Sequence, residues 1–252
     1  MRYFGGKGRV GKQIAQIINA KLNSRPFLSL FTGAGWVEQY IEGDKTLCDA
    51  HIYLIQMYKA LQNGYDLPSS ISREEYTHIK NNMDDDKALS GFVGFACSHS
   101  GKFFRGYASD KSGRNYALNG KNSMLKKQQN GLLNSLFINC DYREMLGAKG
   151  HVIYCDPPYK NTESLDYKVK YKGQDFNTNF NHDVFWENMR FLSKHNLVFI
   201  SEYEAPSDFI CVWEQAVKSD MNAKSGGKLS KLERLFVLEN RWLNDEEGEV
   251  IE

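Results

Sequence analysis

The sequence predicts a doubly wound α/β fold, and three observations indicate it. Short apolar runs of strand length recur along the chain, at residues 27–31, 46–48, 136–139, 151–155, 197–200 and 235–238. Helical spacing of apolar residues separates several of these runs, over residues 12–22, 52–61 and 185–192. The first strand leads into a glycine turn at 32–35, followed by a short helix at 36–41 and the second strand. This order is how a parallel sheet with helices on both faces begins.

Composition places the chain among ordinary globular proteins. Its 252 residues are 41% hydrophobic and 25% charged, enough to bury a sizeable core. No apolar run is long enough to span a bilayer and the N-terminus has no apolar signal segment, so we expect no membrane attachment. The five cysteines form no C-x-x-C pair, so we expect neither a disulfide framework nor a zinc site. These features favour a reducing cytoplasm.

The regular pattern is interrupted once. Residues 65–131 are polar, rich in Gly, Asn, Ser and Lys, and only weakly periodic. We therefore predict one catalytic domain, formed by residues 1–64 and 132–252, with an inserted region at 65–131.

The sharpest motif is Asp156-Pro157-Pro158-Tyr159, directly after an apolar strand. Ligands of open α/β sheets bind beyond the carboxyl ends of the strands. The Asp156 carboxylate and the rigid Pro157 carbonyl could each accept a hydrogen bond from one N–H of an aromatic amine, which would localise the lone pair on nitrogen. Tyr159 offers a flat face for an extruded base. The motif therefore predicts chemistry at a nucleobase amine; a proline-stiffened turn capped by Asp156 is the alternative interpretation.

A second group of residues predicts a cofactor site. Gly33 and Gly35, after Phe31, let the backbone approach a ligand closely, and Asp49 ends the next strand, where it could bind ribose hydroxyls. No G-x-G-x-x-G sequence is present, which makes NAD less suitable than a cofactor without a pyrophosphate. S-adenosylmethionine fits that description. The opening Tyr3-Phe4-Gly5-Gly6-Lys7 could lie against the sulfonium cofactor, with Lys7 near its methionine carboxylate. A flexible terminus with a solvated lysine is the alternative interpretation.

Charge in the inserted region predicts contact with nucleic acid. Between residues 91 and 131, seven basic residues stand against one acid, although the whole chain has a formal net charge of only +1. Aromatic residues lie between them, namely Phe103, Phe104, Tyr107 and Tyr116. Such a stripe suits phosphate contact and insertion into a distorted duplex, and a solvated loop is the alternative. The predicted DNA contacts are Lys102, Arg105, Lys111, Arg114, Lys121, Lys126 and Lys127.

Several stretches resemble, in order, the motifs of the Dam-like (D12 class) DNA adenine methyltransferases. They are residues 3–7, residues 31–35, Asp49, residues 139–142 and residues 156–159. Further stretches are similar to the phage-encoded branch of that family, at residues 91–95, 101–107, 201–206 and 233–236. The likeness thus covers nearly the whole chain.

The resemblance implies a Rossmann-like methyltransferase sheet of seven strands, the last antiparallel, with an inserted target-recognition region. It implies methyl transfer from S-adenosylmethionine to adenine N6 in double-stranded DNA, by base flipping and direct in-line transfer. By the same likeness Phe31, Gly33 and Gly35 line the cofactor, Asp49 holds its ribose, and Asp141 with Tyr142 lies near its adenine. Two features depart from the family: Tyr3-Phe4 stands where Dam-type members commonly have tryptophan, and residues 160–180 form a long, lysine-rich stretch.

Other activities stay open at this point. Cytosine C5 methylation is disfavoured because it needs a nucleophilic cysteine, usually after proline, and the sequence has no Pro-Cys pair. Cytosine N4 methylation, methylation of RNA or of protein glutamine, and a catalytically silent DNA-binding protein of the same fold are the alternatives. We expect a cytoplasmic enzyme of a bacterial or phage-infected cell that uses no metal.

Overall fold

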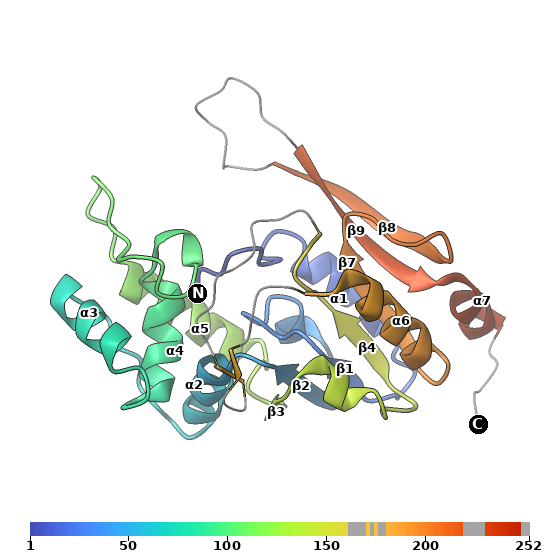
Figure 1. Ribbon diagram of the computed structural model, residues 1–252, viewed down its shortest axis with the longest axis horizontal. Coiled ribbons are helices and arrows are strands. Elements are labelled where there is room, and N and C mark those ends of the chain that lie inside the picture. The colour runs from blue at the N-terminus through green and yellow to red at the C-terminus, as the bar shows by residue number, and fades with distance from the viewer. Residues whose placement is uncertain (161–169, 172–173, 176–179, 219–229, 248–252) are drawn as a thin grey trace.

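The computed structural model describes residues 1–160, 170–171, 174–175, 180–218 and 230–247 (Figure 1). Its centre is a seven-stranded sheet in the order β3-β2-β1-β4-β7-β9-β8. Strands β3, β2, β1, β4 and β7 pair in parallel, and β9 runs antiparallel to both of its neighbours. The predicted α/β sheet of seven strands with an antiparallel last strand is therefore confirmed.

The strand bounds agree with the apolar runs of the sequence. In sheet order the strands are β3 (Leu136–Asn139), β2 (Lys45–Asp49), β1 (Phe27–Ser29), β4 (Val152–Cys155), β7 (Leu197–Glu202), β9 (Ser230–Leu238) and β8 (Phe209–Lys218). A separate two-stranded antiparallel pair is formed by β5 (Lys170–Tyr171) and β6 (Gln174–Asp175). Of the strands in the seven-stranded sheet, only the edge strand β8 was not predicted from the sequence pattern.

Helices cover both faces of the sheet because its strands are apolar on both sides. One core contains Phe27 and Val152 and joins the sheet to α1 (Gly11–Asn19), α2 (Ile52–Gln62) and α7 (Glu239–Glu247). The other core contains Leu28 and Ile153, the next residues along the same two strands, and joins the sheet to α6 (His182–Ser193). Successive side chains of a strand point to opposite faces, so each strand contributes to both cores.

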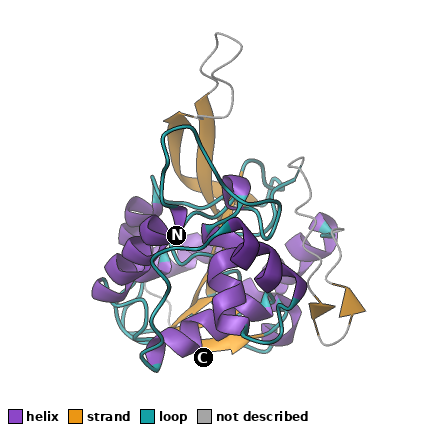
Figure 2. Ribbon diagram, turned by 90° about the vertical axis from the view of Figure 1, so that its left-hand side faces the viewer, coloured by secondary structure: helices purple, strands orange, loops and turns teal. Residues whose placement is uncertain are grey.

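The region between β2 and β3 is helical. After α2 it forms α3 (Arg73–Asn81), α4 (Lys87–Ala96), the short η2 (His99–Gly101) and α5 (Tyr116–Gln129). These helices lie at one end of the molecule, and the β8–β9 hairpin projects away from its body (Figures 1 and 2). Helix α4 is buried almost all round and shares its core with α2, which explains why the sequence showed no clear helical period there. The predicted boundary at residue 64 falls between α2 and α3.

Short 3-10 turns complete the fold. They are η1 (Glu38–Tyr40), after the glycine turn, and η3 (Tyr142–Met145), after β3. None of the described helices combines the length and the apolar composition needed to cross a membrane.

Two cysteines differ from the sequence prediction. Cys48 and Cys140 form a disulfide between the ends of β2 and β3, with their Cα atoms 5.9 Å apart. The expectation that no disulfide would form is therefore wrong at this pair. The two residues are 92 positions apart in the sequence, and they meet only because β2 and β3 pair in parallel. Cys97 and Cys155 are buried free thiols, and Cys211 is exposed.

Candidate functional site

The predicted site residues meet at one edge of the sheet. The glycine turn follows β1, Asp49 ends β2, Asp141 and Tyr142 follow β3, and Asp156 follows β4. Because these four strands are adjacent and parallel, their carboxyl ends lie side by side. The topology thus assembles in space residues that span more than a hundred positions of the sequence.

The glycine turn is joined directly to Asp49. Gly33 and Gly35 have φ of +48° and +65°, a backbone conformation that glycine adopts readily and other residues rarely do. The backbone N–H of Gly33 donates to the Asp49 carboxylate at 2.7 Å, and the Tyr58 hydroxyl donates to the Gly33 carbonyl at 2.8 Å. Turn and acid therefore hold one another in place.

Burial shifts the ionisation of Asp49 toward neutral pH. Burial raises the pKa of Asp49 to about 6, although backbone N–H groups of His51 and Gly33 oppose the shift by donating to the carboxylate. Asp49 therefore changes charge within the range of pH in which proteins work.

Predicted aromatic residues border the same edge. An added Cβ at Gly33 would come within 3.1 Å of the Tyr3 ring, so Tyr3 lies against the turn. The Tyr3 ring also packs on Phe95, at a centroid distance of 4.9 Å. The rings of Phe31 and Tyr142 lie 5.3 Å apart and connect β1 with the end of β3. The turn is thus flanked by flat apolar surfaces.

Asp141 already has a cationic partner. It accepts hydrogen bonds from the backbone N–H and the guanidinium of Arg143, at 2.9 and 2.7 Å. Asp141 also caps η3, where the Glu144 carboxylate accepts from its N–H. This residue is therefore fixed at the end of β3.

The Asp156 carboxylate binds the ammonium of Lys7. The Nζ of Lys7 lies 2.7 Å from Oδ1 of Asp156 and 3.6 Å from Oε2 of Glu233. The same ammonium lies 4.4 Å from the centroid of the Tyr159 ring, and the Tyr159 hydroxyl donates to Glu233 at 3.3 Å. Side-chain exposure is 4% for Lys7 and 21% for Asp156. The structure thus places Lys7 on the acidic motif, whereas the sequence analysis expected it near a cofactor carboxylate.

Burial and charge oppose one another in this cluster. Burial raises the pKa of Asp156, and Lys7 counteracts that shift through its charge and its hydrogen bond. Burial would lower the pKa of Lys7, but Asp156 and Glu233 outweigh it and the pKa is raised. A further carboxylate, Glu202, accepts the backbone N–H groups of Lys160 and Tyr203 at 2.7 and 2.6 Å. The edge beyond β4 is thus an acidic cluster neutralised in part by one buried cation.

The predicted basic surface of the inserted region divides into three groups. Arg105, Lys111, Arg114 and Lys126 are exposed. Lys102 and Lys121 are half-buried: the Nζ of Lys102 lies over the Phe4 ring, and that of Lys121 lies 2.6 Å from the Asp66 carboxylate. Lys127, in contrast, is 1% exposed.

Lys127 therefore departs from the prediction that it contacts DNA. Its ammonium donates to the Ala34 carbonyl in the glycine turn and lies 3.7 Å from the centroid of the Trp36 ring. Burial lowers the pKa of Lys127 to about 7, and the nearby Glu38 opposes that shift. A lysine held under the turn cannot reach a phosphate at the surface.

Two aromatic residues of the inserted region are also buried. Phe103 and Phe104 are 8% and 6% exposed, and their rings pack against each other at 4.8 Å. The expectation that they would enter a DNA duplex is wrong for this arrangement, because both belong to the core around α4.

Sequence reasoning missed Glu233 as a site residue. It stood in a stretch that resembles the family, but it received no role. One signal was available: Glu233 shares the strand parity of Leu235 and Val237, which face a core, and a charge at such a position calls for a buried partner.

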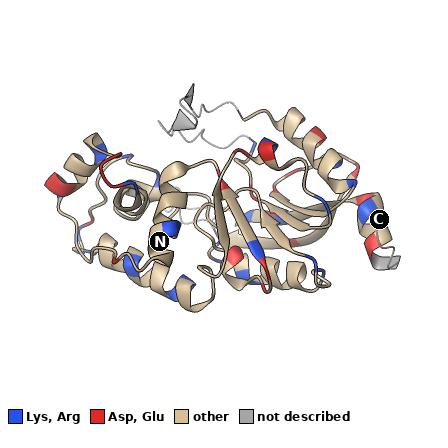
Figure 3. Ribbon diagram, turned by 90° about the horizontal axis from the view of Figure 1, so that it is seen from below, with Lys and Arg blue, Asp and Glu red and all other residues tan. Residues whose placement is uncertain are grey.

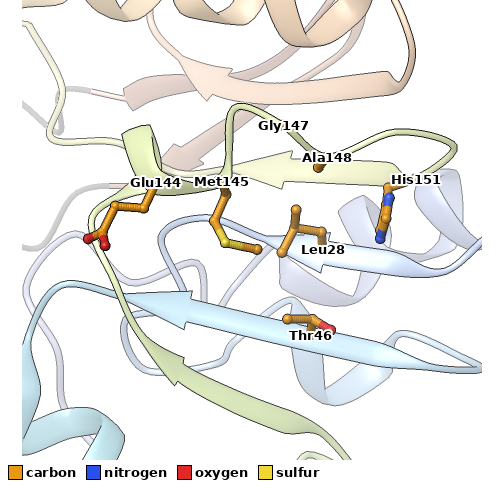
Figure 4. A pocket seen from close by; sticks show the side chains of 7 residues that line it. All are labelled: Leu28, Thr46, Glu144, Met145, Gly147, Ala148 and His151. Carbon is orange, nitrogen blue, oxygen red and sulfur yellow. The ribbon is translucent and has the colours of Figure 1, made fainter.

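A cavity of about 280 Å³ lies away from this cluster (Figure 4). It borders β1 and β2 beneath the segment that connects η3 to β4, and its lining is mainly apolar: Leu28, Thr46, Glu144, Met145, Gly147, Ala148 and His151. None of the predicted site residues lines it. Within the described residues, no group of three or more His, Cys, Asp or Glu side chains is arranged to hold a metal ion.

The sheet order and the residues at its edge define a Rossmann-like α/β protein with a mixed sheet of seven strands, one of them antiparallel. Residues 3–94 match the model of the family described as D12 class N6 adenine-specific DNA methyltransferase. The matched stretch contains Lys7, the glycine turn and Asp49. No curated protein matches the chain in sequence.

Two solved structures resemble the chain in fold. One is an Escherichia coli protein, yhhF, provisionally described as a methyltransferase, with 11% identity, a TM-score of 0.38 and coverage of 92% of this chain and 87% of that one. The other is a conserved hypothetical protein of Streptococcus pyogenes, with 10% identity, a TM-score of 0.32 and coverage of 88% and 96%. Both scores are low, so the fold class rests on the sheet order itself.

Replacing Lys7 by methionine is expected to destabilise the protein most at high pH. Without the cation the pKa of Asp156 in the folded state rises further. The loss of stability therefore grows as the pH rises above the pKa of the unfolded chain, about 3.9, and is largest once the pH exceeds the raised pKa of the folded state. We expect a loss of about 3 kcal/mol in the free energy of unfolding at pH 8, and a smaller loss at pH 5.5. Urea unfolding at the two pH values measures both, with the exposed Lys12→Met as the control. Equal losses at both pH values would contradict the assigned ion pair.

Proposed function

We propose that this chain is a site-specific DNA methyltransferase that transfers a methyl group from S-adenosylmethionine to adenine N6 in duplex DNA. One observation carries the proposal: the Asp156 carboxylate at the tip of β4 accepts a hydrogen bond from the Lys7 ammonium at 2.7 Å. The neighbouring strand β1 ends in the glycine turn that is bonded to Asp49. The family match over residues 3–94 supports it. We extend that assignment to the whole chain and to the phage-encoded branch.

The residues at the sheet edge fit S-adenosylmethionine. Gly35 is also required by packing, since a Cβ there would meet the buried Leu132 side chain at 2.9 Å, and the shape of the turn is fixed in this way. Asp49 is suited to the ribose hydroxyls, and Phe31 and Tyr142 offer flat apolar surfaces to an adenine ring. We also assign Tyr3 and Asp141 to this site. When bound, the cofactor supplies an electrophilic methyl group on a sulfonium.

Asp156 and Pro157 are suited to hold the target amine. An exocyclic NH₂ is a weak nucleophile because its lone pair is delocalised into the ring. The Asp156 carboxylate and the Pro157 carbonyl each accept a hydrogen bond from one of its two N–H groups, and this localises the lone pair on nitrogen. Pro158 stiffens the turn. Tyr159 stacks on the extruded base. A methyl group carried on the sulfonium of the bound cofactor would pass to this nitrogen in line: the C–S bond would break, a thioether would leave, and the amine would lose one proton. No covalent enzyme intermediate would form, so positioning by these residues would supply most of the acceleration.

The inserted region, residues 65–131, is the proposed target-recognition part of an enzyme whose catalytic domain comprises residues 1–64 and 132–252. Exposed Arg105, Lys111, Arg114 and Lys126 are suited to phosphate contact, and Lys102 and Lys121 lie in the same region. Charges of both signs occur at this end of the molecule (Figure 3), so we expect local phosphate contacts and not a uniformly basic face. Lys127 is left out because it is buried.

The proposal is tested by incubating the protein with labelled S-adenosylmethionine and duplex DNA and analysing the nucleosides. We expect N6-methyladenine from the wild type. Asp156→Asn should lower kcat at least about a hundredfold, since an acceptor for the amine is lost, while cofactor affinity stays within a few-fold. The exposed Asp85→Asn is the matched control. N4-methylcytosine as the product, or near-normal turnover of Asp156→Asn, would contradict the proposal.

Cofactor affinity should depend on pH through Asp49. Ribose hydroxyls donate to its ionised form, and its pKa is raised to about 6. Affinity should therefore be constant above pH 7 and fall below pH 6, by at most about tenfold for each pH unit. Calorimetric titration with S-adenosylmethionine from pH 5 to pH 8 measures this. Asp49→Asn should bind weakly at every pH with a flattened profile, and a flat profile in the wild type would remove the ribose role.

A further inference from the structure

The ammonium of Lys7 is hydrogen-bonded to Oδ1 of Asp156, an acceptor on which the proposed reaction depends. It donates to Oδ1 of Asp156 at 2.7 Å, and an exocyclic amine held by that carboxylate would also present an N–H donor to it. The carboxylate has a second oxygen, but an amine that approaches Oδ1 competes with the ammonium for that oxygen. Binding of the target amine at Oδ1 therefore requires Lys7 to weaken or leave this bond.

Lys7 has little room to leave the cluster altogether. Its side chain is 4% exposed, and an ammonium stripped of both water and a counter-ion is strongly unfavourable in such a place. A second acceptor is therefore needed within reach. Oε2 of Glu233 lies 3.6 Å from the Lys7 nitrogen, so a small displacement turns this contact into a full hydrogen bond.

The position of Glu233 suits it to accept a hydrogen bond from this ammonium. Its side chain is 16% exposed and belongs to β9, whereas Lys7 precedes α1 and Asp156 follows β4. The Tyr159 hydroxyl donates to the same carboxylate at 3.3 Å, so Glu233 contacts both the lysine and the ring of the acidic motif.

We propose that Glu233 is a positioning residue that takes over the ammonium of Lys7 when the target amine binds Asp156. The inference rests on the proposed function and adds a step to it. Donors and acceptors balance: one hydrogen bond donated by Lys7 moves from Oδ1 of Asp156 to Glu233, and the target amine donates to the vacated oxygen. The cation stays in the cluster, and Glu233 does not touch the substrate.

The test compares two duplexes that differ only in the target amine. One carries adenine at the methylated position, identified by sequencing methylated DNA from cells that express the protein, and the other carries purine, which lacks the exocyclic NH₂. Only adenine requires Lys7 to move. Glu233→Gln should weaken binding of the adenine duplex about tenfold, as expected for the loss of one charge-assisted hydrogen bond, and leave binding of the purine duplex unchanged.

Two further variants sharpen the comparison. Glu233→Asp keeps the carboxylate and should retain most of the preference for adenine. Glu214→Gln removes an exposed carboxylate from the neighbouring strand β8, where it pairs with Arg234 at 3.3 Å, and should leave both affinities unchanged. Circular dichroism verifies that each variant is folded.

A measurement on the unmodified protein covers the case in which Glu233→Gln does not fold. The ¹⁵N resonance of the Lys7 ammonium should shift when the adenine duplex is added and stay in place with the purine duplex. Equal weakening of both duplexes by Glu233→Gln, no weakening of either, or the same lysine resonance with both would overturn the inference. Failure of the proposed function is distinguishable, because the wild type would then yield no N6-methyladenine.

Discussion

The partly buried ion pair between Lys7 and Asp156 is the interaction on which the site depends. A carboxylate removed from water at the end of β4 is unfavourable unless a cation or hydrogen-bond donors compensate it. Lys7 provides that cation from the segment before α1, and Glu233 extends the pair to β9. Three distant parts of the chain thus meet at the Lys7 ammonium, which fixes the direction of the Asp156 carboxylate.

The parallel sheet supplies the other constraint. It brings the ends of β1 to β4 to one edge, so that the glycine turn with Asp49 and the acidic motif lie at neighbouring strand ends. The inserted region is tied to this edge, because Lys127 on α5 donates to the Ala34 carbonyl in the glycine turn. Helix α5 and the glycine turn are therefore joined directly.

Much of this arrangement was predictable from the sequence. Period and apolar runs located six of the seven central strands and helices α1, α2 and α6, and strand order placed Asp49 and Asp156 at ligand-binding ends. Helix α4 was not predicted, because a helix that is buried all round has no amphipathic period. The bond between Cys48 and Cys140, the burial of Lys127 and the role of Glu233 depend on tertiary contacts between residues far apart in the chain. Local pattern carries no information about such contacts.

We propose that the Asp156 carboxylate at the tip of β4 binds an aromatic amine beside the methyl donor. A crystal structure of the protein with S-adenosylmethionine or a stable analogue, and with duplex DNA containing its methylated site, tests this most directly. We expect an extruded adenine whose N6 lies within hydrogen-bond distance of Asp156. We also expect the cofactor to lie on the glycine turn, with its ribose at Asp49. A cofactor bound elsewhere, or a target base that makes no contact with Asp156, would contradict it.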